Sequence, residues 1–174
     1  MEELLPQVPL VKFPLLLGVE NFENKKAIPV ATNEGLSWFA DAKSYPDGAK
    51  VVAVGKFYLN LKVIAVIFLV TSPGETDRPD DKELILTIVN TETGKMNSRS
   101  VATANAEDYG RTFMKTPEEG KSFMHFESEE ITITFREFGI VDGKFIPDKS
   151  QIKTFPGNQK GSDASDKAIK NWMK

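Results

Sequence analysis

The sequence predicts a mainly β fold, an antiparallel meander that closes as a barrel or packs as a sandwich. Short segments rich in Val, Ile, Thr and Phe recur along the chain, and turn signals separate them. No helix-length segment stands between successive strands, so the alternation that builds a parallel sheet is missing. A chain of 174 residues fits one domain spanning 1–174. We expect about nine to eleven strands joined by short connections.

The first segments of the chain predict edge elements. Residues 8–17 are mostly apolar but include two prolines, which cannot donate hydrogen bonds to a neighbouring strand. We therefore expect an extended arm or an edge strand over 1–20. Residues 27–31 form a second edge candidate, because Pro29 interrupts them. The segment 36–40 is interpreted as either a strand or one helical turn.

The clearest strands follow the turn signal at 45–48, where Pro, Asp and Gly occur together. Residues 50–59 predict one strand, and residues 61–71 predict the next. Both faces of the second strand are apolar. One face carries Val63, Ala65, Ile67 and Leu69, and the other carries Ile64, Val66, Phe68 and Val70. A strand with two apolar faces is expected at the centre of a sheet, covered on both sides.

The rest of the chain predicts further strands and an ambiguous C-terminal segment. Strands are expected over 82–91, 96–103, 121–126, 130–138, 144–146 and 151–155. A hairpin turn is expected at 141–144, where Gly143 supplies a positive φ. Residues 104–119 are polar and ambiguous. Residues 157–174 form either a polar tail or a short helix over 165–174. The residues expected to cap this helix are Ser165 or Asp163.

Composition and motif content argue against most enzyme classes. The chain has no cysteine, which excludes thiol nucleophiles, disulfides and thiolate metal sites. Its only histidine, His125, cannot build a multi-histidine zinc site, and a packed strand histidine is a simpler interpretation than a catalytic one. The phosphate-binding patterns G-x-x-x-x-G-K-[ST] and G-x-G-x-x-G and the hydrolase pattern G-x-S-x-G are absent. We therefore predict a non-enzymatic protein with no cofactor, no metal site and no catalytic residue.

Charge and hydropathy restrict the partners. A net charge of −3 and a pI near 5.3 argue against general nucleic-acid binding. The apolar stretch 51–70 is interrupted by Gly55, Lys56, Asn60 and Lys62, so two neighbouring strands explain it better than a membrane span. The N-terminus has neither a basic leader nor a long apolar region, which predicts a cytoplasmic protein unless a signal peptide has been removed.

One set of segments resembles a known group of proteins. It begins with Val54-Gly55-Lys56-Phe57-Tyr58-Leu59-Asn60 and the apolar strand at 63–70, and it continues with the segments at 91–95, 130–134 and 142–146. In this order they resemble uncharacterised β-rich lipoproteins of Bacteroidetes. The resemblance implies a precursor with a signal peptide and a lipid anchor, and therefore a location in the periplasm or at the cell surface. It supplies no functional residue.

Acidic pairs and aromatic side chains are the remaining candidates for chemistry. Two neighbouring carboxylates can hydrolyse a glycosidic bond and acidic loops can hold calcium, but pairs at strand ends are usually solvated. The acidic groups are Asp80-Asp81, Glu118-Glu119 and Glu127-Glu129-Glu130. The aromatic residues considered for stacking on a sugar or a peptide are Trp38, Tyr45, Tyr58, Tyr109 and Trp172. Among these, Tyr45 and Tyr109 are the candidate ligand-binding residues, although packing at the core or its rim is the simpler interpretation of the set.

The predicted function is therefore a non-enzymatic, extracytoplasmic binding or interaction domain. An unknown protein or glycan partner is expected on the polar loops 72–81 and 104–120, because β scaffolds commonly carry recognition on loops. One alternative is an inhibitor or immunity-type protein that masks an enzyme, since an acidic chain would suit a basic target. A second alternative is a carbohydrate-active hydrolase with paired carboxylates. The oligomeric state stays open, because the edge at 9–14 could pair with another chain.

Overall fold

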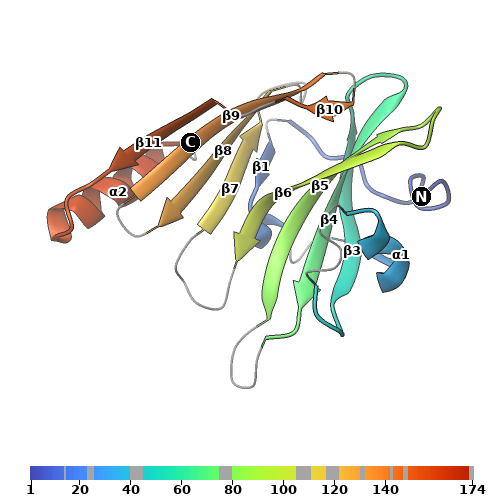
Figure 1. Cartoon of the computed structure of the whole chain (residues 1–174), viewed down its shortest axis with the longest axis horizontal. Coiled ribbons are helices and arrows are strands. Elements are labelled where there is room, and N and C mark those ends of the chain that lie inside the picture. The colour runs from blue at the N-terminus through green and yellow to red at the C-terminus, as the bar shows by residue number, and fades with distance from the viewer. Residues whose placement is uncertain are drawn as a thin grey trace.

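The computed structural model shows a mainly β protein (Figure 1). The residues that the structure describes are 1–13, 15–22, 26–39, 45–74, 80–104, 111–116, 122–129, 132–141, 143–146 and 149–172. The strands in this part of the chain are β1 (Leu15–Leu17), β2 (Ile28–Val30), β3 (Lys50–Tyr58), β4 (Val63–Ser72), β5 (Asp81–Asn90), β6 (Met96–Ala104), β7 (Arg111–Thr116), β8 (Ser122–Glu129), β9 (Thr132–Val141), β10 (Lys144–Phe145) and β11 (Lys149–Thr154). The helices are η1 (Val19–Asn21), a 3-10 helix, and the α-helices α1 (Thr32–Ser37) and α2 (Gln159–Trp172).

The strands follow one another across a single sheet in the order β10-β9-β8-β7-β6-β5-β4-β3-β2, and every pair along this path is antiparallel. The predicted antiparallel meander is therefore confirmed. Pro29 lies in β2 at one end of the path, as expected for an edge strand. No pairing among the described strands joins β2 to the other end of the sheet.

The sheet divides into two halves between β6 and β7. In the described residues these two strands pair only at Ala104 and Arg111. Further along β7, the short strand β1 pairs with residues 114–116 instead. One half therefore contains β2 to β6, and the other contains β7 to β11 together with β1. The halves also meet face to face, because Ile140 and Phe145 pack against the core of the first half.

Strand β4 is the centre of the first half, and its apolar residues from Val63 to Val70 are all buried. The prediction of a central strand covered on both sides is confirmed. On one face, here called face A, Ala65, Ile67 and Leu69 pack with Leu84, Leu86 and the chain of η1. On the other face, here called face B, Ile64, Val66, Phe68 and Val70 pack with Ile85 and Val89. Two separate apolar clusters therefore sandwich a single layer of sheet.

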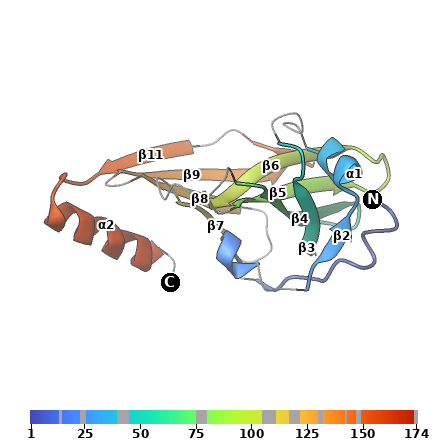
Figure 2. The same ribbon diagram turned by 90° about the horizontal axis from the view of Figure 1, so that it is seen from below.

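The N-terminal arm (residues 1–22) covers both faces. Its first part places Met1, Leu4, Leu5 and Val8 on face B, and its later part places Val11, Phe13, Leu15, Leu17 and Val19 on face A. Between these parts the arm crosses the edge of β3 (Figure 2). Lys56 N–H donates to the Pro9 carbonyl at 2.8 Å, and Val11 N–H donates to the Lys56 carbonyl at 2.9 Å. The arm therefore satisfies backbone hydrogen-bonding groups on the edge of β3, beyond the part of this edge that pairs with β2.

Two features of β3 allow the arm to cross so closely. Val54 is an extra residue, because the pairing with β4 shifts between Ala53 and Gly55. A Cβ on Gly55 would lie 2.5 Å from Val11 Cγ1, so only glycine fits beneath the arm. Lys56, which is 7% exposed, sends its Nζ to the carbonyl of Leu5. A buried ammonium thus finds a hydrogen-bond acceptor in the arm, as buried charges require.

The helices differ from their predicted forms. Of the segment 36–40, predicted as a strand or one helical turn, residues 36–37 end α1, which begins at Thr32, and residue 40 lies outside the described residues. The C-terminal helix exists, yet the prediction that it begins near residue 165 is wrong, because α2 begins at Gln159 and contains both expected caps. Its cap is Asn158, whose side-chain oxygen accepts from the Gly161 N–H at 3.1 Å.

Candidate functional site

The first candidate site is a groove of about 470 Å³ beside the edge strand β2. Its walls come from three elements, namely the start of the N-terminal arm, β2 and α1 (Figure 2). The lining residues are Met1, Glu2, Glu3, Leu4, Gln7, Ile28, Pro29, Val30, Ala31, Glu34 and Trp38. A volume of this size lies within the usual range of ligand pockets.

Three carboxylates distinguish this groove, which we call the acidic groove. Glu2 and Glu3 lie on the turns that open the arm, and Glu34 lies in the first turn of α1. All three are exposed, and no described lining residue is Lys or Arg. The only cationic group in the lining is the Met1 amino group, 3.6 Å from Glu34 Oε1. The groove therefore carries a surplus of negative charge.

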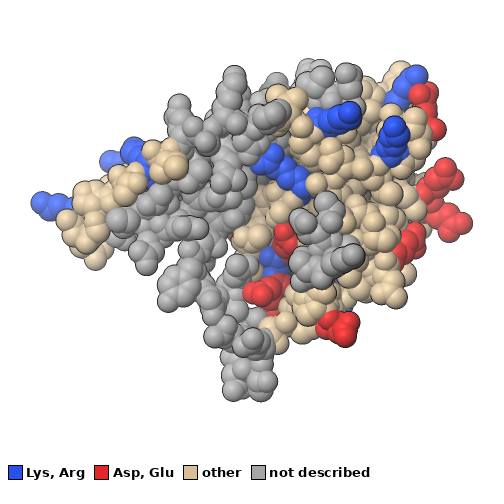
Figure 3. Space-filling view, viewed as in Figure 1, with Lys and Arg blue, Asp and Glu red and all other residues tan. Residues whose placement is uncertain are grey.

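The distribution of charge over the visible surface agrees with this. Figure 3 shows acidic side chains gathered at the end of the molecule where the N-terminus and α1 lie and basic side chains over α2 at the opposite end, with further basic side chains over the middle of the molecule and beside the acidic end. Separated charges of this kind steer a charged partner toward one end of the molecule before contact.

Trp38 supplies an aromatic wall for the acidic groove. The residue ends α1, is half-buried, and places its ring 5.7 Å from the ring of Phe68, centroid to centroid. Its carbonyl accepts a hydrogen bond from Ser98 Oγ at 2.9 Å, and Ser98 Oγ in turn lies 2.9 Å from Thr87 Oγ1. The indole thus packs on the core of face B, and the backbone of Trp38 is tied to Ser98 of β6. A fixed indole beside carboxylates suits a guanidinium or ammonium group.

The opposite wall is held by hydrogen bonds within the arm. The N–H groups of Leu4 and Leu5 donate to the Met1 carbonyl at 3.1 and 3.0 Å. Gln7 Nε2 donates to the Glu3 carbonyl at 2.9 Å. These bonds hold the backbone at Glu2 and Glu3 without using their carboxylates.

The predicted ligand-binding residues lie elsewhere. Tyr45 is half-buried, packs against face B and donates its hydroxyl to the Glu83 carboxylate on β5. Tyr109 lies outside the described residues. Of the two predicted recognition loops, the structure describes 72–74 and 80–81 in the first, and 104 and 111–116 in the second. The role of these residues and loops in binding stays a prediction.

The residues weighed for catalysis are described only in part: Glu130 lies outside the described residues, and of Glu127 and Glu129 only the backbone is described, in β8. Asp80 and Asp81 are exposed, and Asp80 Oδ1 accepts from the Gly74 N–H at 3.4 Å. His125 pairs with Met114 and Arg136 along β8, and its side chain is outside the described atoms. Glu118 and Glu119 lie outside the described residues. No group of three His, Asp or Glu that could hold a metal ion occurs among the described residues.

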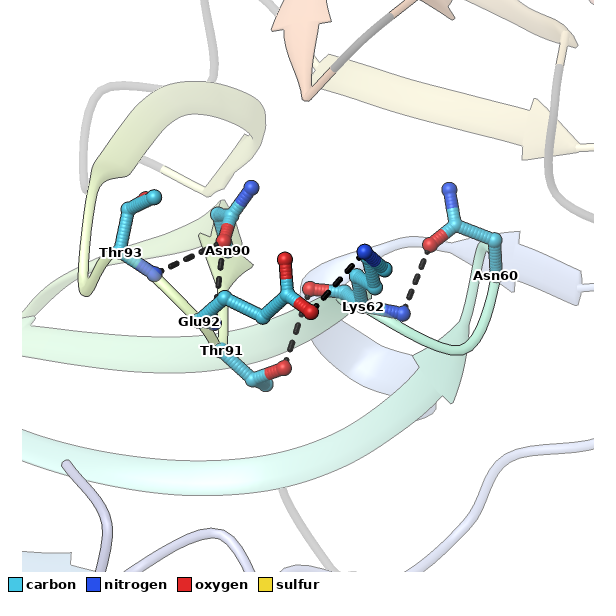
Figure 4. A network of polar contacts seen from close by, with 6 residues as sticks. All are labelled: Asn60, Lys62, Asn90, Thr91, Glu92 and Thr93. Carbon is cyan, nitrogen blue, oxygen red and sulfur yellow. Dashed lines mark hydrogen bonds and ion pairs between the residues drawn. The ribbon is translucent and has the colours of Figure 1, made fainter.

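A polar network joins the β3–β4 and β5–β6 turns, but it serves the fold (Figure 4). Lys62 Nζ lies 2.9 Å from Glu92 Oε1, and Thr91 donates through its N–H and its hydroxyl to the Lys62 carbonyl at 2.9 and 3.1 Å. Asn90 Oδ1 accepts from two following N–H groups at 3.0 Å each. These polar groups satisfy one another, so we assign the network a structural role.

Comparisons with known proteins add no functional assignment. The chain matches no known protein family, no curated protein and no solved structure. Within the described residues, no helix is long and apolar enough to cross a membrane.

Proposed function

We propose that this chain is a non-enzymatic binding or interaction domain whose acidic groove holds a basic segment of a partner protein. The observation that carries the proposal is the joint presence of three exposed carboxylates and a fixed indole in one groove. A Lys or Arg side chain can stack on the face of Trp38 while its charged end meets Glu34 or the carboxylates of the arm. An extracytoplasmic location, implied by the resemblance to lipoproteins, belongs to the same proposal.

The exposure of the carboxylates determines what kind of binding they support. Exposed ion pairs contribute only about 0–1 kcal/mol each, so Glu2, Glu3 and Glu34 contribute mainly to encounter rate and specificity. The affinity then depends on a side chain of the partner that is buried against Trp38 and the apolar residues of β2. Binding should accordingly weaken as salt rises, because exposed charges are screened over about 8 Å at physiological ionic strength.

The inhibitor alternative is favoured by the same observation. A protein that masks a basic enzyme needs a concentrated acidic surface, and acidic side chains gather at the end of the molecule around the N-terminus and α1. Inhibition differs from simple binding in one measurable respect, since the partner's catalytic rate must fall as the complex forms. The hydrolase alternative draws less support, because a catalytic acid normally sits in a site shielded from water.

The proposal is tested by affinity capture with matched variants. Wild-type protein and a Glu2→Gln/Glu3→Gln/Glu34→Gln variant are immobilised, together with an Asp47→Asn control that removes an exposed carboxylate outside the groove. An acetylated peptide of arginine and glycine is passed over each. We expect the wild type and the control to retain the peptide, and the triple variant to lose it.

The same three proteins are then exposed to lysate and envelope fractions of the native host. A partner retained by the wild type and the control but lost from the triple variant supports the proposal. Equal retention of the peptide and of every partner by all three proteins would overturn it.

A further inference from the structure

A second hollow lies beside the later part of the arm, which packs on face A. It has a volume of about 690 Å³ and is lined by Pro9, Leu10, Val11, Lys12, Leu15, Leu16, Asn21, Lys26 and Val54. None of these residues lines the acidic groove. The two hollows are therefore distinct, and we call the second one the arm hollow.

The walls of the arm hollow are apolar. Its floor includes Val54, the extra residue of the β3 bulge, which is 1% exposed, and Leu15, which is 7% exposed. Its rim includes Leu10, which remains 63% exposed. An exposed leucine beside an apolar hollow gains free energy when an apolar ligand covers both.

Two lysines give the arm hollow its charge. Lys12 follows the crossing of β3, Lys26 precedes β2, and both residues are part of the lining. Both are exposed, and none of the described carboxylates lies within ion-pair distance of either. Their alkyl stems extend the apolar lining while their charged ends remain in water.

Asn21 adds a further polar group to the lining of the arm hollow. Its Nδ2 donates to the Leu16 carbonyl at 3.5 Å, which ties η1 to β1 at the edge of the hollow. The arrangement is thus an apolar chamber with an amide and two ammonium groups in its lining. A ligand that matches it needs an apolar chain and a single anionic end.

We propose that the arm hollow binds a free single-chain amphiphile with a carboxylate head, such as a fatty acid. The chain lies against Leu10, Leu15 and Val54, and the carboxylate faces Lys12 and Lys26. This site goes beyond the binding of a basic partner and rests on different residues. Either proposal can therefore fail while the other stands.

The first test uses a series of alkyl carboxylates from octanoate to dodecanoate, each kept below its micelle concentration. Isothermal titration calorimetry is expected to show one saturable site. Affinity should rise about fourfold for each added methylene until the hollow is filled. The absence of saturable binding, or an affinity independent of chain length, would overturn the proposal.

The second test changes the head group while keeping the twelve-carbon chain. Dodecanoate is compared with dodecyl maltoside and with dodecyltrimethylammonium, and we expect the carboxylate to bind tightest and the cation weakest. Equal binding of all three would show adsorption to apolar surface alone and would overturn the proposal. Binding to vesicles of an anionic phospholipid without binding of free dodecanoate would overturn it as well.

The third test changes the protein. A Lys12→Gln/Lys26→Gln variant should bind dodecanoate about fivefold more weakly, and Lys95→Gln, an exposed lysine outside the hollow, should bind as the wild type does. A Leu10→Asp variant should lose binding while keeping the urea midpoint of the wild type, because the side chain is exposed. Unchanged affinity in the double lysine variant and in Leu10→Asp would contradict the proposed site.

Discussion

The acidic groove and the arm hollow are lined by successive parts of the same N-terminal arm on opposite faces of the sheet, and their chemistry is opposite. On the side of face B, the arm contributes Glu2 and Glu3 to a groove that ends at an indole. On the side of face A, the same arm contributes Lys12 and five aliphatic or proline side chains to an apolar chamber. The difference shows how one chain segment that crosses a sheet edge can present two unrelated surfaces. A substitution on one face of the sheet should therefore change ligand affinity at one site more than at the other.

The largest effect is expected from Phe68→Ala, which acts on face B. Phe68 is fully buried and its ring contacts those of Trp38 and Phe39 at 5.7 and 5.5 Å between centroids. Removing the ring leaves a cavity, which should lower the free energy of unfolding by about 3–5 kcal/mol in urea titrations. Trp38 loses its support, so binding of the arginine peptide should weaken more than binding of dodecanoate. Equal weakening of both ligands would contradict the separation of the two faces.

A smaller effect is expected from Gly55→Ala, which acts on the arm where it crosses β3. The new Cβ would meet Val11 Cγ1 at 2.5 Å, so the arm must move outward. We expect a loss of about 1–3 kcal/mol in the free energy of unfolding. Because Val11 lines the arm hollow, dodecanoate affinity should fall in calorimetry while peptide affinity changes little. A variant as stable as the wild type would show that the arm does not press on Gly55.

Asn158→Ala should change stability without changing either site. Asn158 caps α2 through the Gly161 N–H at 3.1 Å, and loss of a side-chain cap costs about 1 kcal/mol. Circular dichroism should report a small loss of helix at elevated temperature. Both ligand affinities should match those of the wild type, which makes this variant a control for general destabilisation. A change in either affinity would link α2 to a site that it does not line.

The smallest effect on stability is expected from Glu34→Gln. The carboxylate is 57% exposed and its partner is the Met1 amino group at 3.6 Å, so the change in unfolding free energy should stay below about 0.5 kcal/mol. Peptide binding should nevertheless weaken, and its dependence on sodium chloride should become shallower, since one screened charge is lost. A steeper salt dependence in fluorescence titrations would contradict this assignment.

The sequence predicts the first half of the sheet better than the second. Both apolar faces of β4 are visible in its residues, and the structure covers both. The turn at 141–144 was also predicted from its glycine, and Gly143 adopts the expected positive φ, 73°. In contrast, β7 lies within the polar segment 104–119, and its place is determined by pairing with β1 and β8 rather than by an apolar pattern.

The start of α2 and the two sites were not predicted, for different reasons. Gly161 in the first turn of α2 hides the start of the helix, because glycine lowers helix propensity and Asn158 resembles a turn residue. The acidic groove combines Glu2 and Glu3 with Glu34 and Trp38, two pairs that are distant from each other in sequence and form no motif. Only the aromatic character of Trp38 was a usable signal. The arm hollow depends on the crossing at Lys56, which no local pattern reveals.

The central claim is that the arm separates two sites with opposite ligand preference. The most direct measurement is a set of ¹H–¹⁵N correlation spectra of the wild-type protein, titrated first with the arginine peptide and then with dodecanoate. We expect the peptide to shift the amides of residues 2–4 and 30–38, and dodecanoate to shift those of residues 10–13, 15, 16, 21 and 26. If both ligands shift one common set of amides, or if each displaces the other, the two sites are not separate and the account is wrong.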